Sequence, residues 1–410
     1  MKKNINIKKL ITIFSFFLVI IFSSLLFFSY KNNSEKITFN HFLNDIYEDI
    51  FLKKNKRVKS MNDFVHMDEI SKFFYESDRK LIIFDKSFSD TGYILYSGYD
   101  SEYETSTTSL YSIENDKIIH KWIPPIKEIN NQAPNHLERY NIKKNYRMQH
   151  PLLLPNGELV FTSGEGPLAK IDKCGNLLWS IDRHFHHSIE FYDDNLIVVP
   201  INLSEKYSEM FPVKNEGFAI VDIKSGKIKD EKSLLKILEQ NKLIGLLYGV
   251  GEFEYDRIHL NDVEIIKNSD SFYNEGDMIF SSKHLSTVFI YRPSTNKILN
   301  YQTGPWLNQH DVDYLGNGNF TIFDNGTFRY ELNEDHDVFH NKNNRIYSWY
   351  PITNRFEEIY KNSMREVITP TQGLHQNLMN GDMYVEDTDN FVIHRFSENK
   401  KRWSFVNYLG

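Results

Sequence analysis

The stretch HDVDYLGNGNFTIFD, from His310 to Asp324, contains two short runs of alternating apolar and polar residues, separated by a turn rich in Gly and Asn. This alternation is typical of β-strands, and a Gly/Asn turn between two strands indicates a hairpin. A second hairpin pattern, TVFIYRPSTNKILNY, lies shortly before it, from Thr287 to Tyr301. The two patterns recur in constant order: the first begins at residues 82, 150, 187, 259, 310 and 375, and the second at residues 108, 168, 217, 287, 345 and 390.

Two hairpins make four strands, and six repeats of four strands predict an all-β chain, a six-bladed β-propeller over residues 81–410. A pair of β-sandwiches would also contain many short strands, but six paired units in constant order favour the propeller. The composition agrees, because aromatic residues reach 15% and alanine occurs only at Ala133, Ala169 and Ala219. Tyr and Phe favour strands, whereas alanine is the strongest helix former.

Charge and cysteine content exclude several classes of function. The 410 residues carry 48 basic and 55 acidic side chains, a net charge of −7, which argues against a nucleic-acid partner. The single cysteine excludes an internal disulfide and any Cys-rich metal or iron–sulfur centre.

The N-terminal region predicts a membrane anchor. Residues 1–9 form a basic tail, and the run from Leu10 to Phe28 contains no charge and is long enough to cross a bilayer as a helix. A cleaved signal peptide is the alternative, but the run ends without a small-residue cleavage site. We therefore expect a transmembrane signal anchor at residues 10–30, a short helical spacer at 31–80, and the propeller outside the cytoplasm.

Histidines occur at matching places in the repeats. His150, His187, His259, His310 and His375 all stand at the start of the first strand of a unit. The innermost strands of propeller blades surround a central channel, so these five side chains are expected to converge at one channel mouth.

Such a ring of imidazoles could bind a metal, perform nucleophilic or acid–base chemistry, or simply fill the channel as satisfied polar groups. A metal is disfavoured because the nearby acids, Glu190, Asp262, Asp311 and Asp313, alternate along the sequence and are expected to face different ways. The segment Asp324-Asn325-Gly326 reads first as a turn.

Several segments resemble the bacterial arylsulfotransferases, in the order found in that family. The resemblance runs roughly from His150 to the C-terminus, and its last part, TQGLHQNLMNGDMYVE, is a looser match. The matching segments are HHSIEF (186–191), HLNDVE (259–264), FSSKHLS (280–286) and GPWLNQHDVDYLGNGNFTIFDNG (304–326).

The resemblance implies a six-bladed propeller that transfers a sulfuryl group from an aryl sulfate to a phenol through a sulfated histidine. It places the nucleophile at His310, further catalytic histidines at His187 and His259, and Lys283 in the slot where the family has arginine. Lys283 and a protonated histidine are expected to meet the sulfuryl oxygens, while another imidazole exchanges protons with the phenols. The candidates for binding are His150, His186, His375 and Asn261.

Two departures from the family pattern stand in the sequence. Lys283 is a point charge where arginine is a planar fork, and the Ser-Arg pair that usually follows FDNG is replaced by residues 327–330, TFRY.

No cofactor and no metal are expected. The expected partners are an aryl sulfate donor, a phenolic acceptor, the membrane through the N-terminal helix and, as one option, a second copy in a homodimer. The resulting prediction is a single-pass protein of the inner (cytoplasmic) membrane whose propeller faces the periplasm or the cell exterior. The alternatives are an anchored propeller that binds a ligand or protein without turnover and, third, a metal-dependent hydrolase or lyase.

Overall fold

The computed structural model describes residues 80–134, 146–203, 213–249, 255–332, 335–340 and 343–407. The chain divides into two units, residues 1–72 and 73–410, and all described residues belong to the second. The predicted basic tail and anchor and all but the last residue of the predicted spacer, residues 31–80, lie outside the described residues. Within the described ranges, no helix is both long and apolar enough to span a bilayer.

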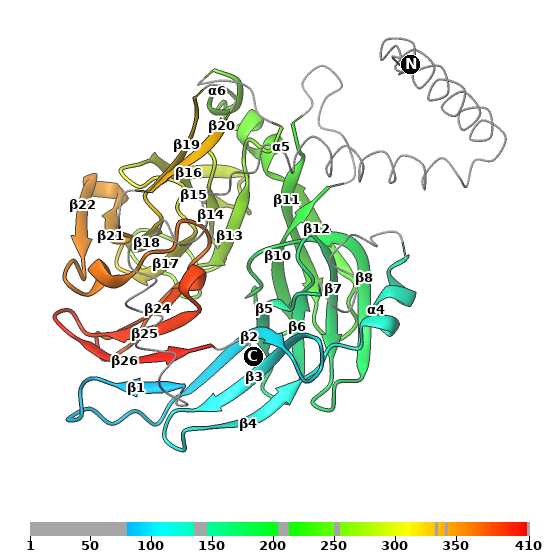
Figure 1. Ribbon diagram of the computed structural model, residues 1–410. Coiled ribbons are helices and arrows are strands. Elements are labelled where there is room, and N and C mark those ends of the chain that lie inside the picture. Colours follow the sequence, from blue (N-terminus) through cyan, green and yellow to red (C-terminus); the bar gives the residue numbers. More distant parts are fainter. Residues whose placement is uncertain are drawn as a thin grey trace, which may run out of the picture. The chain divides into compact units, whose positions relative to one another are not determined.

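The described unit is an all-β propeller, as predicted, built from antiparallel sheets that surround a common centre (Figure 1). The first sheet has the order β2-β3-β4: β2 (Tyr93–Asp100), β3 (Thr105–Ser112) and β4 (Lys117–Trp122). Two sheets have four strands in sequence order: β13 (Leu260–Ile265), β14 (Met278–Ser282), β15 (Thr287–Arg292), β16 (Lys297–Thr303); and β17 (Asp311–Gly316), β18 (Asn319–Asp324), β21 (Arg345–Tyr350), β22 (Arg355–Ile359).

The largest sheet has eight strands and contains two of the predicted units. Its strands are β5 (Gln149–Leu153), β6 (Leu159–Thr162), β7 (Gly166–Ile171), β8 (Leu177–Phe185), β9 (Glu190–Phe191), β10 (Leu196–Asn202), β11 (Glu216–Asp222) and β12 (Ile228–Ser233). The two halves join where β8 pairs with β10 at only two residue pairs, Phe185 with Ile201 and His184 with Asn202.

The last sheet closes the ring with a strand from the start of the described chain. It contains β23 (His375–Asn377), β24 (Met383–Asp387), β25 (Val392–Phe396), β26 (Lys401–Val406) and β1 (Leu81–Ile83). β1 lies antiparallel to β26, with Leu81 opposite Phe405. The expectation that residues 82 and 83 belong to the first unit is therefore wrong, because a pairing between distant segments leaves no local signal.

The remaining elements are insertions and connections. The ribbon β19 (Thr327–Leu332) and β20 (Asp335–His340) is inserted between β18 and β21. The helices are α4 (Ile126–Gln132), α5 (Leu234–Gln240) and α6 (Gly245–Tyr248), with 3-10 turns η6 (Pro351–Thr353), η7 (Ser363–Glu366) and η8 (Thr388–Asn390). The described strands thus form five sheets and a two-stranded ribbon, so the count of separate blades differs from the six predicted.

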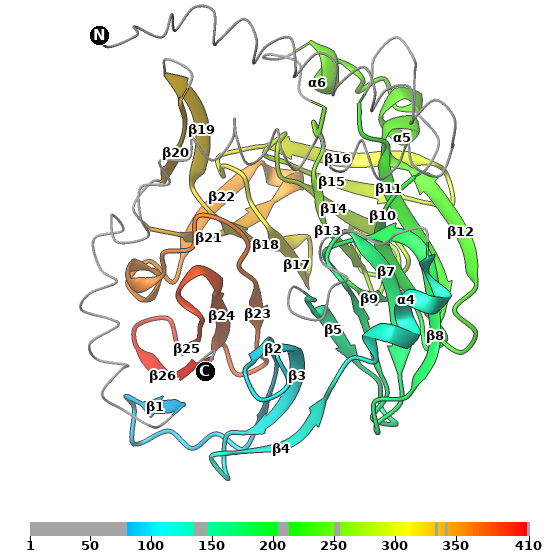
Figure 2. The ribbon, with the colours of Figure 1, turned by 45° about the vertical axis from the view of Figure 1, so that its right-hand side comes forward.

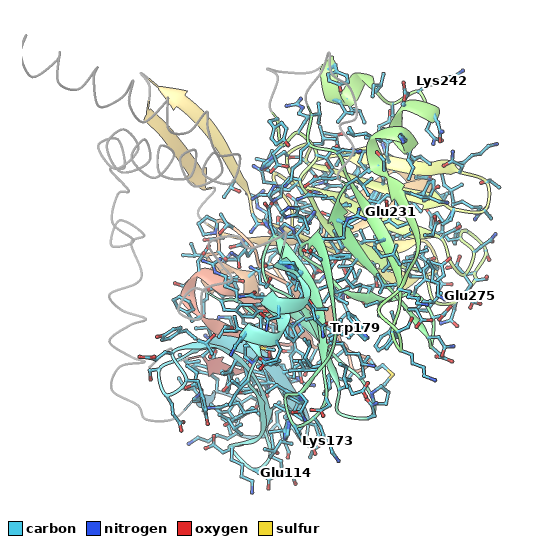
Figure 3. All side chains as sticks on the ribbon, turned by 90° about the vertical axis from the view of Figure 1, so that its right-hand side faces the viewer. Glu114, Lys173, Trp179, Glu231, Lys242 and Glu275 are labelled. Atoms are coloured by element: carbon cyan, nitrogen blue, oxygen red, sulfur yellow. The ribbon has the colours of Figure 1, made fainter. Side chains whose placement is uncertain are left out.

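The core lies between neighbouring sheets. Inner strands such as β11 and β14 are buried on both faces, which explains why their sequences are apolar in continuous runs. Large rings fill the wedge between sheets, as where Trp306 meets Trp349 at a centroid distance of 5.7 Å. Figure 3 shows polar residues such as Glu114 and Lys173 in the outer hairpin turns.

Candidate active site

Three of the predicted histidines share an unusual backbone conformation at the inner end of their sheets. His150, His187 and His259 have φ angles of 45°, 56° and 48°, in the left-handed region, where histidine is more tolerated than most side chains. Each stands at or just before the innermost strand, β5, β9 or β13, and these strands face the centre (Figure 2). Non-glycine residues held in this region are often found at functional sites.

The other two histidines occupy different places in their units. The left-handed residues of the next two sheets are Asn308 and Gln372, so His310 lies two residues further along and His375 three. The expectation of one ring of five equivalent histidines is corrected accordingly: three are equivalent and two are offset along the strands.

The equivalent histidines form the centre of a continuous imidazole cluster. Ring centroids lie 6.4 Å apart for His150 and His187, and 5.2 Å apart for His187 and His259. His186 extends the cluster at 5.0 Å from His187, and His284, which sequence reasoning missed, lies 4.4 Å from His259. Burial is the main reason that the pKa values of these rings are lowered, to about 4 for His150 and His284.

His310 is buried and held in one tautomer. Its Nδ1 lies 2.7 Å from Oδ1 of Asn325, whose Nδ2 donates to the carbonyls of Thr369 and Gln372 at 2.8 and 2.7 Å. Since those two bonds identify the NH₂ end of Asn325, its oxygen must face His310 and accept a proton on Nδ1. Nε2 therefore carries the lone pair, which accepts the backbone N–H of Gln372 at 3.1 Å.

The Gln372 loop can approach His310 so closely because of its glycine. Gly373 has a φ of 93°, and a Cβ there would lie 2.6 Å from the ring of Phe323. Only glycine fits both the conformation and the space.

Lys283 acts on His310 electrostatically. Burial, and then the positive charge of Lys283, hold the pKa of His310 well below its usual range. Lys283 follows β14, and its backbone N–H donates to the carbonyl of His259 at 3.0 Å. The three residues therefore lie in one electrostatic site, although a protonated histidine beside the sulfuryl group, expected from the sequence, is not favoured by the lowered pKa values.

A carboxylate orients His259. Oδ2 of Asp256 lies 2.7 Å from Nδ1 of His259, and the backbone carbonyl of Asp256 lies 2.5 Å from Nδ1 of His284. Burial opposes ionisation of Asp256, but the hydrogen bond from His259 and the charges of His259, Lys214 and His284 together outweigh it, so the pKa of Asp256 is lowered. Asp256 thus keeps a proton on Nδ1 of His259 and leaves Nε2 as an acceptor.

A second, partly buried cation and a buried carboxyl lie behind His186. Nζ of Lys214 is 3.1 Å from Glu216 and 3.7 Å from Asp256, and Glu216 lies 3.8 Å from Nε2 of His186. Sequence reasoning missed Lys214, Glu216 and Asp256, because none of them stands in a recognisable motif.

Two predicted binding residues have other partners. Nδ2 of Asn261 donates to the carbonyl of Gln309 at 2.8 Å, so Asn261 positions the segment that carries His310. His375 is bound to Asp311 through Nδ1 at 2.5 Å and to Thr321 through Nε2 at 2.8 Å. It belongs to a carboxylate network and is not in contact with the imidazole cluster through any ring pair among the described residues.

The acids near the channel share a face, contrary to our expectation. Asp311 and Asp313 are two residues apart on β17, and both lie near His375. Burial and neighbouring carboxylates raise the pKa of Asp262 well above its usual range, and that of Glu190 to about 7.

Among the described residues, two groups of side chains are close enough together to hold a metal: Asp256, His259 and His284; and Asp311, Asp313 and His375. In the first group the ammonium of Lys214 lies 3.7 Å from Asp256, which opposes a cation. In the second, both nitrogens of His375 have hydrogen-bond partners within the protein. The chemistry of neither group calls for a metal.

The fold and site define an enzyme-like class of propeller, in which neutral imidazoles and a lysine gather at the inner strands. The chain belongs to the arylsulfotransferase (ASST) family, whose model matches residues 150–407. This confirms the resemblance seen in the sequence.

Comparisons with individual proteins were less specific than the comparison with the family model. No curated protein matched the sequence. The WD40 domain of Pan2 from Neurospora crassa is similar at 9% identity and a TM-score of 0.43, over 80% of this chain and 85% of that one. The C-terminal WD40 domain of Sif2 is similar at 11% identity and a TM-score of 0.38, over 78% and 84% of the two chains.

Proposed function

We propose that this protein transfers a sulfuryl group from an aryl sulfate to a phenolic acceptor through a sulfated His310. The observation that carries the proposal is the state of His310: a buried, neutral imidazole whose Nδ1 proton is held by Asn325 and whose Nε2 carries the lone pair. A neutral imidazole is a strong nucleophile near pH 7.

In the first half-reaction, Nε2 of His310 attacks sulfur, the bond from sulfur to the phenolic oxygen breaks, and the phenol leaves with a proton. The backbone N–H of Gln372, which donates a hydrogen bond to Nε2 of His310, must move away before sulfur can approach that nitrogen. In the second, the acceptor phenol loses its proton, its oxygen attacks sulfur, and His310 is released.

Lys283 is the cation for the sulfuryl oxygens. The transferring group carries spread negative charge, which a fixed positive charge stabilises, as in phosphoryl transfer. The effect of Lys283 on the pKa of His310 supports this assignment, because the same field that disfavours an imidazolium favours an anion at Nε2.

The test is to incubate the protein with 4-nitrophenyl sulfate, with and without a phenol, and to follow nitrophenol release. Donor alone should leave a labile sulfuryl adduct on the peptide that contains His310, and a phenol should remove it. His310→Asn should abolish transfer, whereas His394→Asn, at another buried histidine, should not. If the parent forms no adduct and releases no phenol, the chain is better described as a binding propeller without turnover.

We also propose that residues 10–30 anchor the protein in the cytoplasmic membrane with the propeller outside the cytoplasm. The support is the uncharged run from Leu10 to Phe28 and the four lysines that precede it.

A further inference from the structure

We propose that Glu216 and His186 form a proton relay to His187, which delivers a proton to the departing phenolate and receives one from the acceptor phenol. This inference rests on the proposed sulfuryl transfer and assigns its proton movements. His187 is the group that touches the substrate, and the other two act through it.

The contact between the two histidines is direct. Nδ1 of His186 lies 2.8 Å from Nδ1 of His187, so one nitrogen must donate and the other accept. If His186 donates, the single N–H proton of His187 is on Nε2, and His187 can act as an acid. If His187 donates, its Nε2 carries a lone pair and can act as a base.

The far side of His186 faces a buried carboxyl. Its Nε2 lies 3.8 Å from Oε1 of Glu216, and Asn202 is the other polar side chain beside it. Neither Nε2 of His186 nor Oδ1 of Asn202 forms a well-aligned hydrogen bond within the described part of the chain. Buried polar nitrogens normally have a hydrogen-bond partner. A shift of about 1 Å brings Nε2 of His186 within hydrogen-bond distance of Glu216.

The surroundings of Glu216 allow it to exchange a proton near neutral pH. Its Oε2 accepts the backbone N–H of Leu260 at 2.9 Å, and its Oε1 lies 3.1 Å from Nζ of Lys214. The charged and titratable groups around it are Lys214, Asp256 and His186. Burial raises its pKa to about 7 against the opposing effect of Lys214, the range in which a carboxyl both gives and takes protons near neutral pH.

The relay is needed because the histidines do not hold charge. Burial, followed by Lys214 for His186 and by the neighbouring imidazoles for His187, keeps the pKa values of both histidines well below their usual range. An imidazolium is therefore not stored in the cluster, and a proton given up by His187 must be replaced in the same step. Glu216 is the carboxyl that faces this pair.

The protons balance as follows. As the S–O bond breaks, the phenolate takes the proton from Nε2 of His187, Nδ1 of His187 takes the proton from Nδ1 of His186, and Nε2 of His186 takes the proton of the Glu216 carboxyl. Both imidazoles end neutral, and the Glu216 carboxylate faces Lys214. Each transfer reverses when the acceptor phenol attacks, so the enzyme returns to its starting state.

The test compares donors whose phenols differ in basicity. Glu216→Gln keeps an acceptor for the N–H of Leu260 but removes the proton source. We expect a loss of rate of a few fold for 4-nitrophenyl sulfate, whose phenolate leaves readily, and about 100-fold for phenyl sulfate, whose phenolate needs the proton. Glu386→Gln is the matched control. Glu386 is also a carboxyl whose pKa burial raises to about 7, and within the described part of the chain neither His186 nor His187 is among the groups that shift its pKa.

The pH profile gives a second readout. With phenyl sulfate, the parent rate should fall as the pH rises through about 7, because ionised Glu216 cannot supply a proton. This limb should be absent in Glu216→Gln. If that variant does not fold, Glu216→Asp keeps the charge opposite Lys214 but draws the carboxyl away from His186, and should show the same dependence on the donor.

The outcomes separate the relay from the proposed function. A parent enzyme that releases no phenol from any donor refutes sulfuryl transfer itself. An active parent whose Glu216 variants lose the same factor with every donor, and keep the parent pH profile, shows that Glu216 only supports the structure and overturns the relay.

Discussion

Replacing Asn325 by alanine should weaken both the fold and the chemistry of His310. Asn325 is fully buried and makes three hydrogen bonds, at 2.7 Å to His310 and at 2.8 and 2.7 Å to the carbonyls of Thr369 and Gln372. A buried group left without its partner costs about 1–3 kcal/mol. Since water can enter part of the space, the free energy of unfolding should fall by on the order of 3–5 kcal/mol.

The effect on catalysis follows from one of those bonds. The bond from Nδ1 of His310 to Asn325 favours the reactive tautomer by about 1–3 kcal/mol, which corresponds to a ratio of roughly 5- to 150-fold. Asn325→Ala should therefore lower the ratio of the two tautomers by about that factor and lower kcat by a few fold, because the reactive tautomer loses its preference but stays populated. NMR of ¹⁵N-labelled histidine measures the tautomer directly, and the rate of nitrophenol release measures kcat.

Asn344→Ala is the matched control. Asn344 is also buried and supports the same loop, through bonds of 2.9 and 2.7 Å to the backbone of Thr369, but it has no bond to His310 among the described contacts. It should destabilise the fold to a similar extent and leave the tautomer of His310 unchanged. Equal losses of kcat in the two variants, or an unchanged tautomer in Asn325→Ala, would refute the reasoning.

Three further outcomes are expected. Lys283→Met should lower turnover about 100-fold or more with little change in stability, whereas Lys283→Arg should keep much of the activity; equal rates for the parent and Lys283→Met would remove Lys283 from the site. Burial lowers the pKa of His375, but Asp313 and Asp311 outweigh burial and raise it. The contribution of protonated His375 to the free energy of unfolding should therefore be fully present below the unfolded pKa of about 6.5, and lost as the pH rises through the folded pKa. Urea titrations should then show His375→Gln weaker than the parent at pH 5.5 and closer to it at pH 8.5, and the reverse order would contradict this. The full chain should sediment with membranes at its full mass, and a soluble form that begins near Lys31 would show cleavage instead.

The strands could be predicted from the sequence because their signal is local. Alternating residues and Gly/Asn turns, as in His310 to Asp324, depend on near neighbours alone, and the structure places β17 and β18 there. The closure of the ring by β1 could not be predicted in this way, because Leu81 and Phe405 are brought together only by the complete fold.

The parts of the candidate site that follow from the repeats could be predicted from the sequence, and the parts that depend on tertiary packing could not. His187 and His259 stand at equivalent positions of the repeats and His310 lies two residues beyond that position, so the proximity of the three followed from the architecture. Lys214 and Glu216 meet His186 through tertiary packing and carry no motif. Asn325 was read as part of a turn, and nothing local shows that its amide faces an imidazole from another strand.

The pairing of β1 with β26 also has a consequence for how the chain is made. Residues 81–83 leave the ribosome long before their partners, residues 403–405. Throughout elongation, the short apolar strand from Leu81 to Ile83 lacks its native neighbour, and contacts between such distant segments form slowly. We expect this nascent chain to need protection from aggregation until residues 403–405 emerge, and to close the ring only then.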